Sequence, residues 1–314
     1  MITAYVYKRG QIKRTKLAEV KRSRAWIRVV SPNEESVKKL SDYTKIPLEE
    51  IKESLEEEER PRITSEKYIE LIYRTPLIEN GEVTTFPLYI YIIRNKIITI
   101  EKEPYSTLSN IQANMESKKY KFLFKKGYGY FIFYILDKIN DDFLTNIDKI
   151  AANIDVYEEV TKRDLKIKDI ERIYEQSVTL SFFNQALIAN VEVLNSLRKG
   201  YFKQFSKKDK VLFEELYYDA LQILDTEKIQ REAITNLFNL QSIISSARLN
   251  VFMKKLTLIA LIISIPTMIS GIYGMNFVNI PLRYHPFGFY ITSGVIIIIT
   301  IFALFYFRKS YWTQ

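Results

Sequence analysis

The sequence contains no cysteine, and its single histidine is His285. These absences exclude disulfides, thiol catalysis, thiolate metal sites and a histidine-cluster metal site within one chain. Glycine and proline are also scarce, with nine of each in 314 residues, and residues 207–255 contain neither. Because both residue types interrupt helices, that segment can form one continuous helix.

The sequence also lacks the signatures of common enzymes. It has no GxxxxGK[ST] phosphate loop and no GxSxG nucleophile elbow, and one histidine rules out an HExxH site. We therefore expect no enzymatic activity. The formal net charge is +9, but the basic residues alternate with acidic ones and form no separate stripe. We expect no nucleic-acid partner.

Two apolar runs without a charged residue lie near the C-terminus, at residues 256–273 and 287–307. At about 1.5 Å per residue, each is long enough, or nearly so, for a hydrocarbon core of about 30 Å. Only residues 274–286 separate them. The sequence predicts a hairpin of two transmembrane helices, with most of the chain outside the lipid bilayer.

Basic residues flank this hairpin mainly on one side. Lys254 and Lys255 precede the first run, Arg308 and Lys309 follow the second, and the connector carries only Arg283. The positive-inside rule then predicts that both termini are cytoplasmic and that the connector is external. The N-terminal segment has too many basic residues for a secretory signal, which agrees with a multi-pass protein of the cell (plasma) membrane.

The front of the chain mixes strand-like and helix-like patterns. Residues 25–30 and 88–93 are rich in β-branched and aromatic residues, and residues 96–100 follow as a hairpin partner. In chain order we expect an α/β cytosolic domain (1–136), long acidic helices of the cytosolic domain (137–206), a stalk helix (207–255), a first transmembrane helix (256–273), an external loop (274–286), a second transmembrane helix (287–307) and a basic cytosolic tail (308–314).

Acidic residues gather in two regions. The run at residues 49–60 predicts a solvated helix face, with cation binding as the less favoured alternative. Residues 141–160 and 166–199 predict two long helices, the second closed by Gly200 as a C-cap. Their acidic residues predict one wet, acidic face: Asp148, Asp155, Glu158, Glu159, Asp164, Asp169 and Glu171.

The stalk segment carries an apolar seam at alternating four- and three-residue steps. Such spacing is typical of a coiled coil, although a helix packed on its own domain can show the same pattern, and both interpretations stay open. The seam consists of Ala233, Leu237, Leu240, Ile244, Ala247 and Val251.

A second stripe at the same spacing continues from the stalk into the first apolar run, so its residues share one helix face. It consists of Asn236, Asn239, Ile243, Ser246, Asn250, Met253, Thr257, Ala260, Ser264, Thr267 and Gly271. Small residues allow close helix packing in lipid, whereas several copies around an axis would make this face line water. The asparagines at successive turns favour a pore, because a packing face does not require them.

The segment Tyr273-Gly274-Met275-Asn276-Phe277, directly after the first apolar run, resembles the GMN signature of the CorA family of magnesium channels. Family-like residues precede it at 250–257 and at Pro266, and weaker similarity extends through Trp26 and residues 60–63, 136–139 and 213–219. The resemblance covers nearly the whole chain. It implies a funnel-shaped homopentamer with an α/β cytosolic domain, a long stalk helix and two C-terminal transmembrane helices.

The resemblance also implies the functional residues. A selectivity filter for hydrated Mg²⁺ falls on Gly274, Met275 and Asn276, with the ion held at Asn276. The pore-facing positions of the family fall on Asn250, Met253, Leu256, Ser264, Thr267 and Gly271. All of these except Leu256 belong to the stripe identified from spacing, which adds Ala260 to the expected lining.

This filter suits the chemistry of the ion. Mg²⁺ dehydrates reluctantly and usually keeps several waters. A ring of neutral oxygens from Asn276 can hydrogen-bond the hydrated ion, while a carboxylate ring would hold it too tightly for conduction. Met253 and Leu256 are expected to form an apolar constriction near the cytoplasmic end.

The sequence departs from the family pattern at two places. The external loop has no acidic residue; Ile280-Pro281-Leu282-Arg283 stands where relatives often have MPEL. In the stalk, Asn239 takes the place of an aspartate that helps some relatives bind regulatory Mg²⁺. Regulation could then depend on other acidic residues, and the candidates are Asp219, Asp155, Glu158 and Glu159.

We therefore expect Mg²⁺ uptake through a pore, driven by the membrane potential and inhibited by intracellular Mg²⁺ as the regulatory ion. Transport of Co²⁺, Ni²⁺ or Zn²⁺ by the same architecture is the nearest alternative. A membrane-anchored sensor or scaffold that conducts nothing is the alternative from another class.

Overall fold

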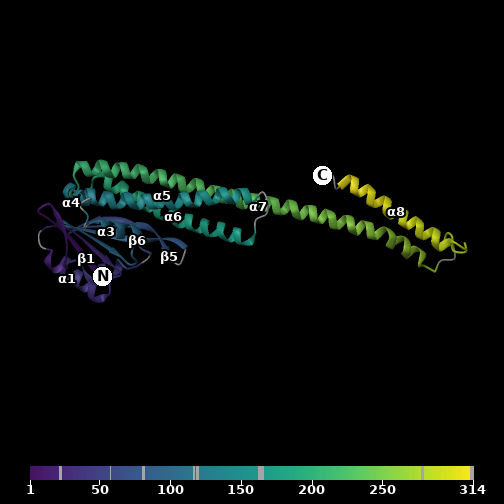
Figure 1. The fold of residues 1–314 in the computed structure, drawn as a ribbon, viewed down its shortest axis with the longest axis horizontal. Coiled ribbons are helices and arrows are strands. Elements are labelled where there is room, and N and C mark those ends of the chain that lie inside the picture. Colours follow the sequence, from purple (N-terminus) through teal and green to yellow (C-terminus); the bar gives the residue numbers. More distant parts are fainter. Residues whose placement is uncertain are drawn as a thin grey trace. The chain divides into compact units, whose positions relative to one another are not determined.

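The computed structural model describes residues 1–20, 23–56, 58–79, 82–115, 117, 120–161, 166–276 and 279–311. It divides into two compact units, Met1–Leu237 and Phe238–Gln314. Figure 1 labels the main elements. The strands are β1 (Ile2–Lys8), β2 (Gln11–Thr15), β3 (Arg24–Val30), β4 (Arg62–Ser65), β5 (Ile69–Glu79), β6 (Glu82–Ile93) and β7 (Lys96–Glu101). The helices are the 3₁₀ turn η1 (Leu17–Glu19), α1 (Glu34–Thr44), α2 (Leu48–Glu53), α3 (Ser106–Met115), α4 (Lys121–Lys126), α5 (Tyr128–Thr161), α6 (Ile167–Lys199), α7 (Lys207–Tyr273) and α8 (Gly288–Tyr311).

The first unit is built on one seven-stranded sheet in the order β2-β1-β3-β7-β6-β5-β4. All neighbouring pairs are antiparallel except β3 and β7, which run parallel because a long excursion through β4, β5 and β6 separates them in the chain. The predicted strands at residues 25–30, 88–93 and 96–100 lie within β3, β6 and β7. The α/β prediction for the front of the chain is confirmed.

Alternate residues of the central strand β3 contact different helices, which explains why its sequence is almost continuously apolar. Ile27 and Val29 belong to the core shared with α1 and α2. Trp26, on the opposite face, lies edge-on to Phe131 of α5 with ring centroids 5.6 Å apart. The sheet is therefore covered on both faces, with α1 and α2 on one side and α3, α5 and α6 on the other, as Figure 1 shows.

Two helix ends have well-formed caps, and the predicted Gly200 C-cap is confirmed. Asn33 caps α1, since its side-chain oxygen accepts a hydrogen bond from the Ser36 backbone N–H at 3.1 Å. Gly200 ends α6 in a left-handed conformation with φ 75°, and its N–H donates to the Leu197 carbonyl oxygen at 3.2 Å.

Three predicted boundaries differ from the structure. Helix α5 begins at Tyr128, so the expected division at residue 137 falls inside a helix; aromatic residues at its start had concealed the helical period. In the acidic run 49–60 the helix α2 ends at Glu53, because the buried Ser54 donates its hydroxyl to the Ile51 carbonyl oxygen and a turn follows. Residues 308–311 of the expected tail continue α8, and residues 312–314 lie outside the described residues.

Helix α7 is uninterrupted over 67 residues, although Pro266 lies inside it. Its first part packs on the first unit through buried residues that end at Leu237. Beyond Leu237 the predicted seam is largely uncovered: Leu240 and Val251 are 40% and 51% exposed, and Ile244 is half-buried. Packing on the protein's own domain therefore explains the seam only up to Leu237; beyond it, the coiled-coil seam stays a prediction.

A buried ion pair joins the sheet to the helices that cover it. Arg28 of β3 donates from Nε and Nη2 to the two carboxylate oxygens of Glu101 in β7, at 2.7 and 2.8 Å. The same guanidinium reaches Gln112 at 2.8 Å and Ser109 at 2.9 Å, both on α3. Burial raises the pKa of Glu101, and the Arg28 guanidinium opposes that effect.

This pair supports a stability prediction. Glu101→Gln leaves the Arg28 charge buried without its partner and should lower the free energy of unfolding by about 3–5 kcal/mol. The loss is measurable by chemical denaturation of the detergent-solubilised protein, followed by the fluorescence of the adjacent Trp26.

Arg28→Met provides the complementary case. The remaining Glu101 carboxyl has a raised pKa, so it is tolerated while protonated and costs stability once ionised. The stability deficit of this variant should therefore grow as the pH rises from 5 to 8. A deficit independent of pH would show that the carboxylate is not the source.

Candidate functional site

Two helices of the described chain are long and apolar enough to cross a membrane: the second part of α7, and α8. Almost none of either is covered by the rest of the chain, and Ala303 is the one apolar α8 side chain counted as buried up to residue 306. Such a large exposed apolar surface requires lipid or further copies of the chain. The prediction of two apolar C-terminal helices is confirmed.

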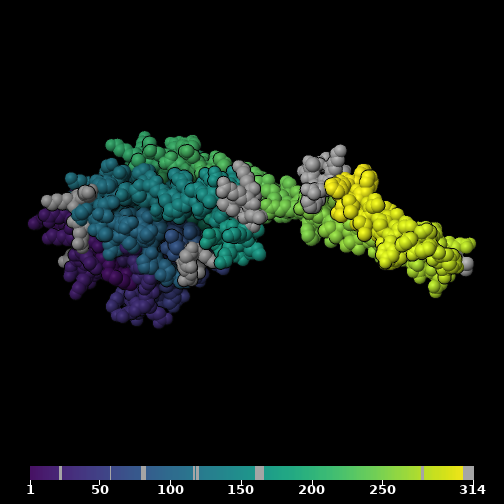
Figure 2. Space-filling model, turned by 45° about the vertical axis from the view of Figure 1, so that its right-hand side comes forward, coloured from purple at the N-terminus to yellow at the C-terminus, as the bar shows by residue number. Residues whose placement is uncertain are grey.

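The half-buried side chains of the second part of α7 fall on one face. Leu258, Ile262, Ile265 and Ile269 recur at steps of four, three and four, and they are less exposed than their neighbours. Within this unit α8 runs back from the connector along the end of α7 in both views (Figure 1; Figure 2). We therefore assign this apolar face to the side of α7 that α8 covers.

The predicted small-residue stripe lies on the other side of the helix. With about 100° between successive residues, Ala260, Ser264 and Gly271 centre roughly 150° away from the half-buried face. The lining positions within the second unit are all exposed: Asn250, Met253, Leu256, Ala260, Ser264, Thr267 and Gly271. The chain therefore leaves the stripe open along its entire length in this unit.

Hydroxyl groups on the stripe are bonded within their own helix. Thr257 donates to the Met253 carbonyl oxygen at 2.9 Å, Ser264 to Leu261 at 2.9 Å and Thr267 to Ile263 at 2.8 Å. Each hydroxyl oxygen keeps acceptor capacity toward the open side. The face is thus polar enough to border water, yet it satisfies its donors without water.

Helix α7 ends at Tyr273, directly before the Gly274-Met275-Asn276 tripeptide. The Gly274 N–H donates to the Ser270 carbonyl oxygen at 2.9 Å, and the Met275 N–H donates to the Ile272 carbonyl oxygen at 3.2 Å. The second bond spans three residues and tightens the last turn. All three tripeptide residues are exposed, and Phe277 lies outside the described residues. The carbonyl end of a helix carries partial negative charge, so Asn276 stands where a cation is favoured.

Among the described residues, no contact requires glycine at position 271 or 274. A Cβ at Gly271 would meet no described atom within 4 Å, and one at Gly274 would lie 3.4 Å from the nearest such atom, the Ser270 carbonyl oxygen. Neither residue has a positive φ.

The connector carries no carboxylate near the tripeptide. Its charged side chain is Arg283, and the neighbouring His285 accepts a hydrogen bond at Nδ1 from the Phe287 backbone N–H at 3.2 Å, just before α8 begins. The described part of the connector therefore offers neutral oxygens and no carboxylate beside the tripeptide.

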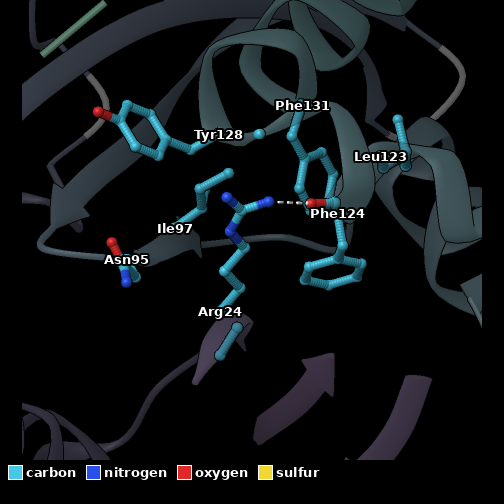
Figure 3. A pocket seen from close by; sticks show the side chains of 9 residues that line it. Arg24, Asn95, Ile97, Leu123, Phe124, Tyr128 and Phe131 are labelled. Atoms are coloured by element: carbon cyan, nitrogen blue, oxygen red, sulfur yellow. Dashed lines mark hydrogen bonds between the residues drawn. The ribbon is translucent and has the colours of Figure 1, made fainter. Parts of the chain in front are cut away.

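A small hollow at the ends of the central strands β3 and β7 is too small for a ligand. Arg24 closes the carbonyl end of α4 by donating to the Phe124 oxygen at 2.8 Å (Figure 3). The cavity between Asn95, Tyr128 and Phe131 holds about 10 Å³. That volume suits about one water molecule.

Comparison with known proteins identifies the family. The profile described as "CorA-like Mg2+ transporter protein" matches residues 22–309. The chain belongs to the CorA family. This membership places it among transporters and not among enzymes.

Individual relatives agree with that assignment. The chain is 31% identical over 288 residues to the "Cobalt/magnesium transport protein CorA" of Methanocaldococcus jannaschii, which covers 91% of this chain and 90% of that protein. The complete structure of the CorA magnesium transporter from that organism superposes with a TM-score of 0.91 at 29% identity, over 99% of this chain and 98% of the other. The predicted arrangement of α/β domain, stalk helix and two apolar helices is confirmed for a CorA protomer.

A more distant structure shares the fold. The full-length CmaX protein superposes with a TM-score of 0.76 at 20% identity, over 98% of this chain and 96% of that chain. At that identity the likeness extends to architecture only.

The candidate regulatory residues of this CorA protein are not brought together within one chain. Asp219 lies on α7, where partial burial, Glu215 and Asp141 of α5 raise its pKa. The side chains of Asp155, Glu158 and Glu159 are exposed and lie further along α5. The 14 residues between positions 141 and 155 correspond to about 21 Å of helix. Asn239 belongs to the second unit, and Asp164 lies outside the described residues.

Asp219 nevertheless has an acidic environment that the sequence interpretation missed. Partial burial, Glu215 and Asp141 raise the pKa of Asp219, and partial burial also raises that of Asp137 on α5. Lys138 lies between the α5 acids and contacts Asp141 at 2.5 Å. The four-residue spacing of Glu215 and Asp219 could have revealed one pair, but only the packing of α5 beside α7 adds Asp141.

Within the described residues, no three acidic or imidazole side chains converge closely enough to hold a metal ion.

Two glycine substitutions should separate effects inside one chain from effects between chains. Gly271→Ala places a methyl group in open space and should leave the thermal stability of detergent-dispersed single chains unchanged. In Gly288→Ala the new Cβ would lie 2.2 Å from the Leu282 carbonyl oxygen, so the connector must distort. Differential scanning fluorimetry of both variants tests this contrast; an equal loss of stability would contradict it.

Proposed function

We propose that this protein takes up Mg²⁺ through a pore formed by a homopentamer, with α7 of each copy surrounding the axis. One observation carries the proposal: the small, weakly polar stripe of α7 faces away from the side assigned to α8 and leads to Gly274-Met275-Asn276. A face that is open in the single chain and polar inside a membrane span is unfavourable toward lipid. Placed around an axis, it lines a water-filled path.

The filter holds a hydrated ion by hydrogen bonds. Five Asn276 side chains supply neutral amide oxygens, and Gly274 allows the backbones to approach the axis. Mg²⁺ keeps its waters because removing them costs more than these oxygens return. Since the connector lacks carboxylates, Asn276 carries most of the ion recognition at this entrance.

Further along the path the lining changes from small to apolar. Gly271, Thr267 and Ser264 leave room for a hydrated ion, while Met253 and Leu256 narrow the cytoplasmic end. An apolar ring excludes water when it is narrow, so a small rotation of α7 can close the path by dewetting.

The membrane potential supplies the driving force. A divalent cation crossing 100 mV releases about 4.6 kcal/mol, which is twice the value for a single charge. We place the protein in the plasma membrane with both termini in the cytoplasm, supported by Lys254 and Lys255 before the first span. Inward flux is then favoured without ATP.

Intracellular Mg²⁺ is proposed to close the pore. Acidic faces of neighbouring copies, including Asp219 and the exposed acids Asp155, Glu158 and Glu159, repel one another when no ion bridges them. Mg²⁺ stabilises the symmetric closed assembly, and its loss shifts the population toward the open one. Asn239 cannot contribute a charge, so weaker inhibition is expected than with an aspartate at that position.

The second candidate function is transport of other divalent cations. The M. jannaschii relative is named as a transporter of cobalt as well as magnesium, and we propose that Co²⁺ and Ni²⁺ can also pass. Competition of each ion with Mg²⁺ in uptake assays distinguishes a shared path from a selective one. A non-conducting sensor remains the alternative from another class.

The filter proposal is tested by Asn276→Ala. Removal of the amide oxygens should reduce Mg²⁺ uptake into proteoliposomes about tenfold or more, because each removed polar contact to a charged species is worth about 1.5–3 kcal/mol. Uptake is followed with a Mg²⁺-sensitive dye under an imposed inside-negative potential.

Asn279→Ala is the matched control, since it removes an exposed asparagine from the same connector. Its uptake should stay within about twofold of the unmodified protein. Native mass spectrometry should show five copies for both variants. Normal uptake by Asn276→Ala would refute the proposed filter and favour the non-conducting alternative.

The regulatory proposal is tested by Asp219→Asn. Removing this carboxylate relieves its repulsion with Glu215 and Asp141, so at neutral pH the metal-free variant should have a higher unfolding temperature than the unmodified protein. Added Mg²⁺ should stabilise the variant less, and half-inhibition of uptake should need about threefold or more internal Mg²⁺. An unchanged Mg²⁺ response would remove Asp219 from the regulatory set.

A further inference from the structure

A second pocket lies at one end of the sheet in the first unit, remote in sequence from the α7 stripe. It has a volume of about 270 Å³. Its walls come from the end of α1, the β4–β5 turn and the β6–β7 hairpin. The lining residues are Tyr43, Thr44, Lys45, Lys67, Tyr68, Ile93, Arg94, Lys96 and Ile98.

The pocket lining is basic and contains no carboxylate. Lys45, Lys67, Arg94 and Lys96 contribute four cationic groups. Within the described part of the chain, none of the four forms an ion pair with an aspartate or glutamate. All charged side chains in the lining are therefore positive, and like charges around one concave surface repel one another unless an anion lies between them. The acids that act on the lining Tyr68 are Glu50, Glu66 and Glu70, which lie outside the lining.

Two of these cations occupy backbone conformations that disfavour them. Lys45 ends α1 with φ 66°, and Arg94 turns the β6–β7 hairpin with φ 53°. Glycine and asparagine are the residues that adopt this left-handed region at least cost. Local folding alone would favour those residues at both positions, so the charged side chains need another explanation.

Lys96 is the least exposed of the four basic residues, and a neighbouring positive charge affects its ionisation. Partial burial and the neighbouring Arg94 guanidinium hold the pKa of Lys96 below its usual value. Its Nζ lies 5.5 Å from the centre of the Tyr43 ring. Tyr68, also in the lining, donates its hydroxyl to Glu50, which lies outside the lining.

We propose that this pocket binds a small, multiply charged phosphate compound, with Lys45, Lys67, Arg94 and Lys96 as its ligands. The volume is slightly below the range of about 300–1,000 Å³ for drug-sized ligands and suits a phosphate chain. Arginine and lysine pair with phosphate through charge-assisted hydrogen bonds.

Pyrophosphate binding to the purified full-length protein in detergent tests the site. The variant Lys45→Asn with Arg94→Asn removes two charges while placing asparagine, which tolerates positive φ, at both strained positions. We expect it to bind pyrophosphate about tenfold more weakly or worse in isothermal titration calorimetry. Its unfolding temperature without ligand should be equal or higher, because the strain and the repulsion are both reduced.

Arg9→Asn with Arg14→Gln is the matched control. Arg9 also has a positive φ, 52°, in the β1–β2 turn, and both side chains are exposed and outside the pocket lining. This control has the same net charge as the pocket variant. It should bind pyrophosphate within about twofold of the unmodified protein. Equal weakening in both variants would show non-specific attraction to a basic protein and would overturn the proposal.

The phosphate group could come from a soluble compound or from a lipid. ATP and short-chain phosphatidate are therefore titrated separately, in the absence of Mg²⁺. Binding of either that is lost in the pocket variant supports the site and identifies the source. No binding of pyrophosphate, ATP or phosphatidate to the unmodified protein would overturn it. Neither outcome depends on transport, so failure here is distinguishable from failure of the pore proposal.

Discussion

The structure depends on the continuity of helix α7. Inside lipid, a backbone N–H or C=O without a partner is unfavourable by several kcal/mol, so a chain can enter a bilayer only as a fully bonded helix or a closed barrel. A single helix of 67 residues meets this requirement while it passes from a soluble domain into a membrane span. The absence of glycine and proline from residues 207–255 makes this continuity possible.

Along this helix the cover supplied by the chain changes. Up to Leu237 one set of apolar residues of α7, from Phe213 onward, is buried in its own domain. Farther along, partial cover, assigned to α8, is found at Leu258, Ile262, Ile265 and Ile269. The rest of this span is uncovered; it carries exposed apolar side chains such as Ile259 and Ile263, and one face of small and weakly polar residues. Because the same face ends at Gly274 and Asn276, the proposed assembly, path and filter all follow from one uncovered surface.

Electrostatics differ between the proposed entrance and the cytosolic domain. The entrance offers neutral oxygens and the carbonyl end of a helix, which attract a hydrated cation weakly enough to release it. In the domain, raised pKa values at Asp219 and Asp137 mark acids that are costly to ionise and sensitive to a nearby cation. The pocket around Lys96 is lined by positively charged side chains, so its proposed ligand is an anion.

Local sequence patterns were sufficient to predict many features of this protein. The apolar runs, the three- and four-residue spacing of the stripe, the Asn33 and Gly200 caps and the GMN tripeptide are properties of neighbouring residues, and the sequence alone determined them. The sequence did not predict contacts between residues that are distant in the chain. The start of α5, the Arg28–Glu101 pair, the approach of Asp141 to Asp219 and the convergence of Lys45, Lys67, Arg94 and Lys96 were decided only by tertiary structure, because packing of the sheet, helices and turns brings those residues together.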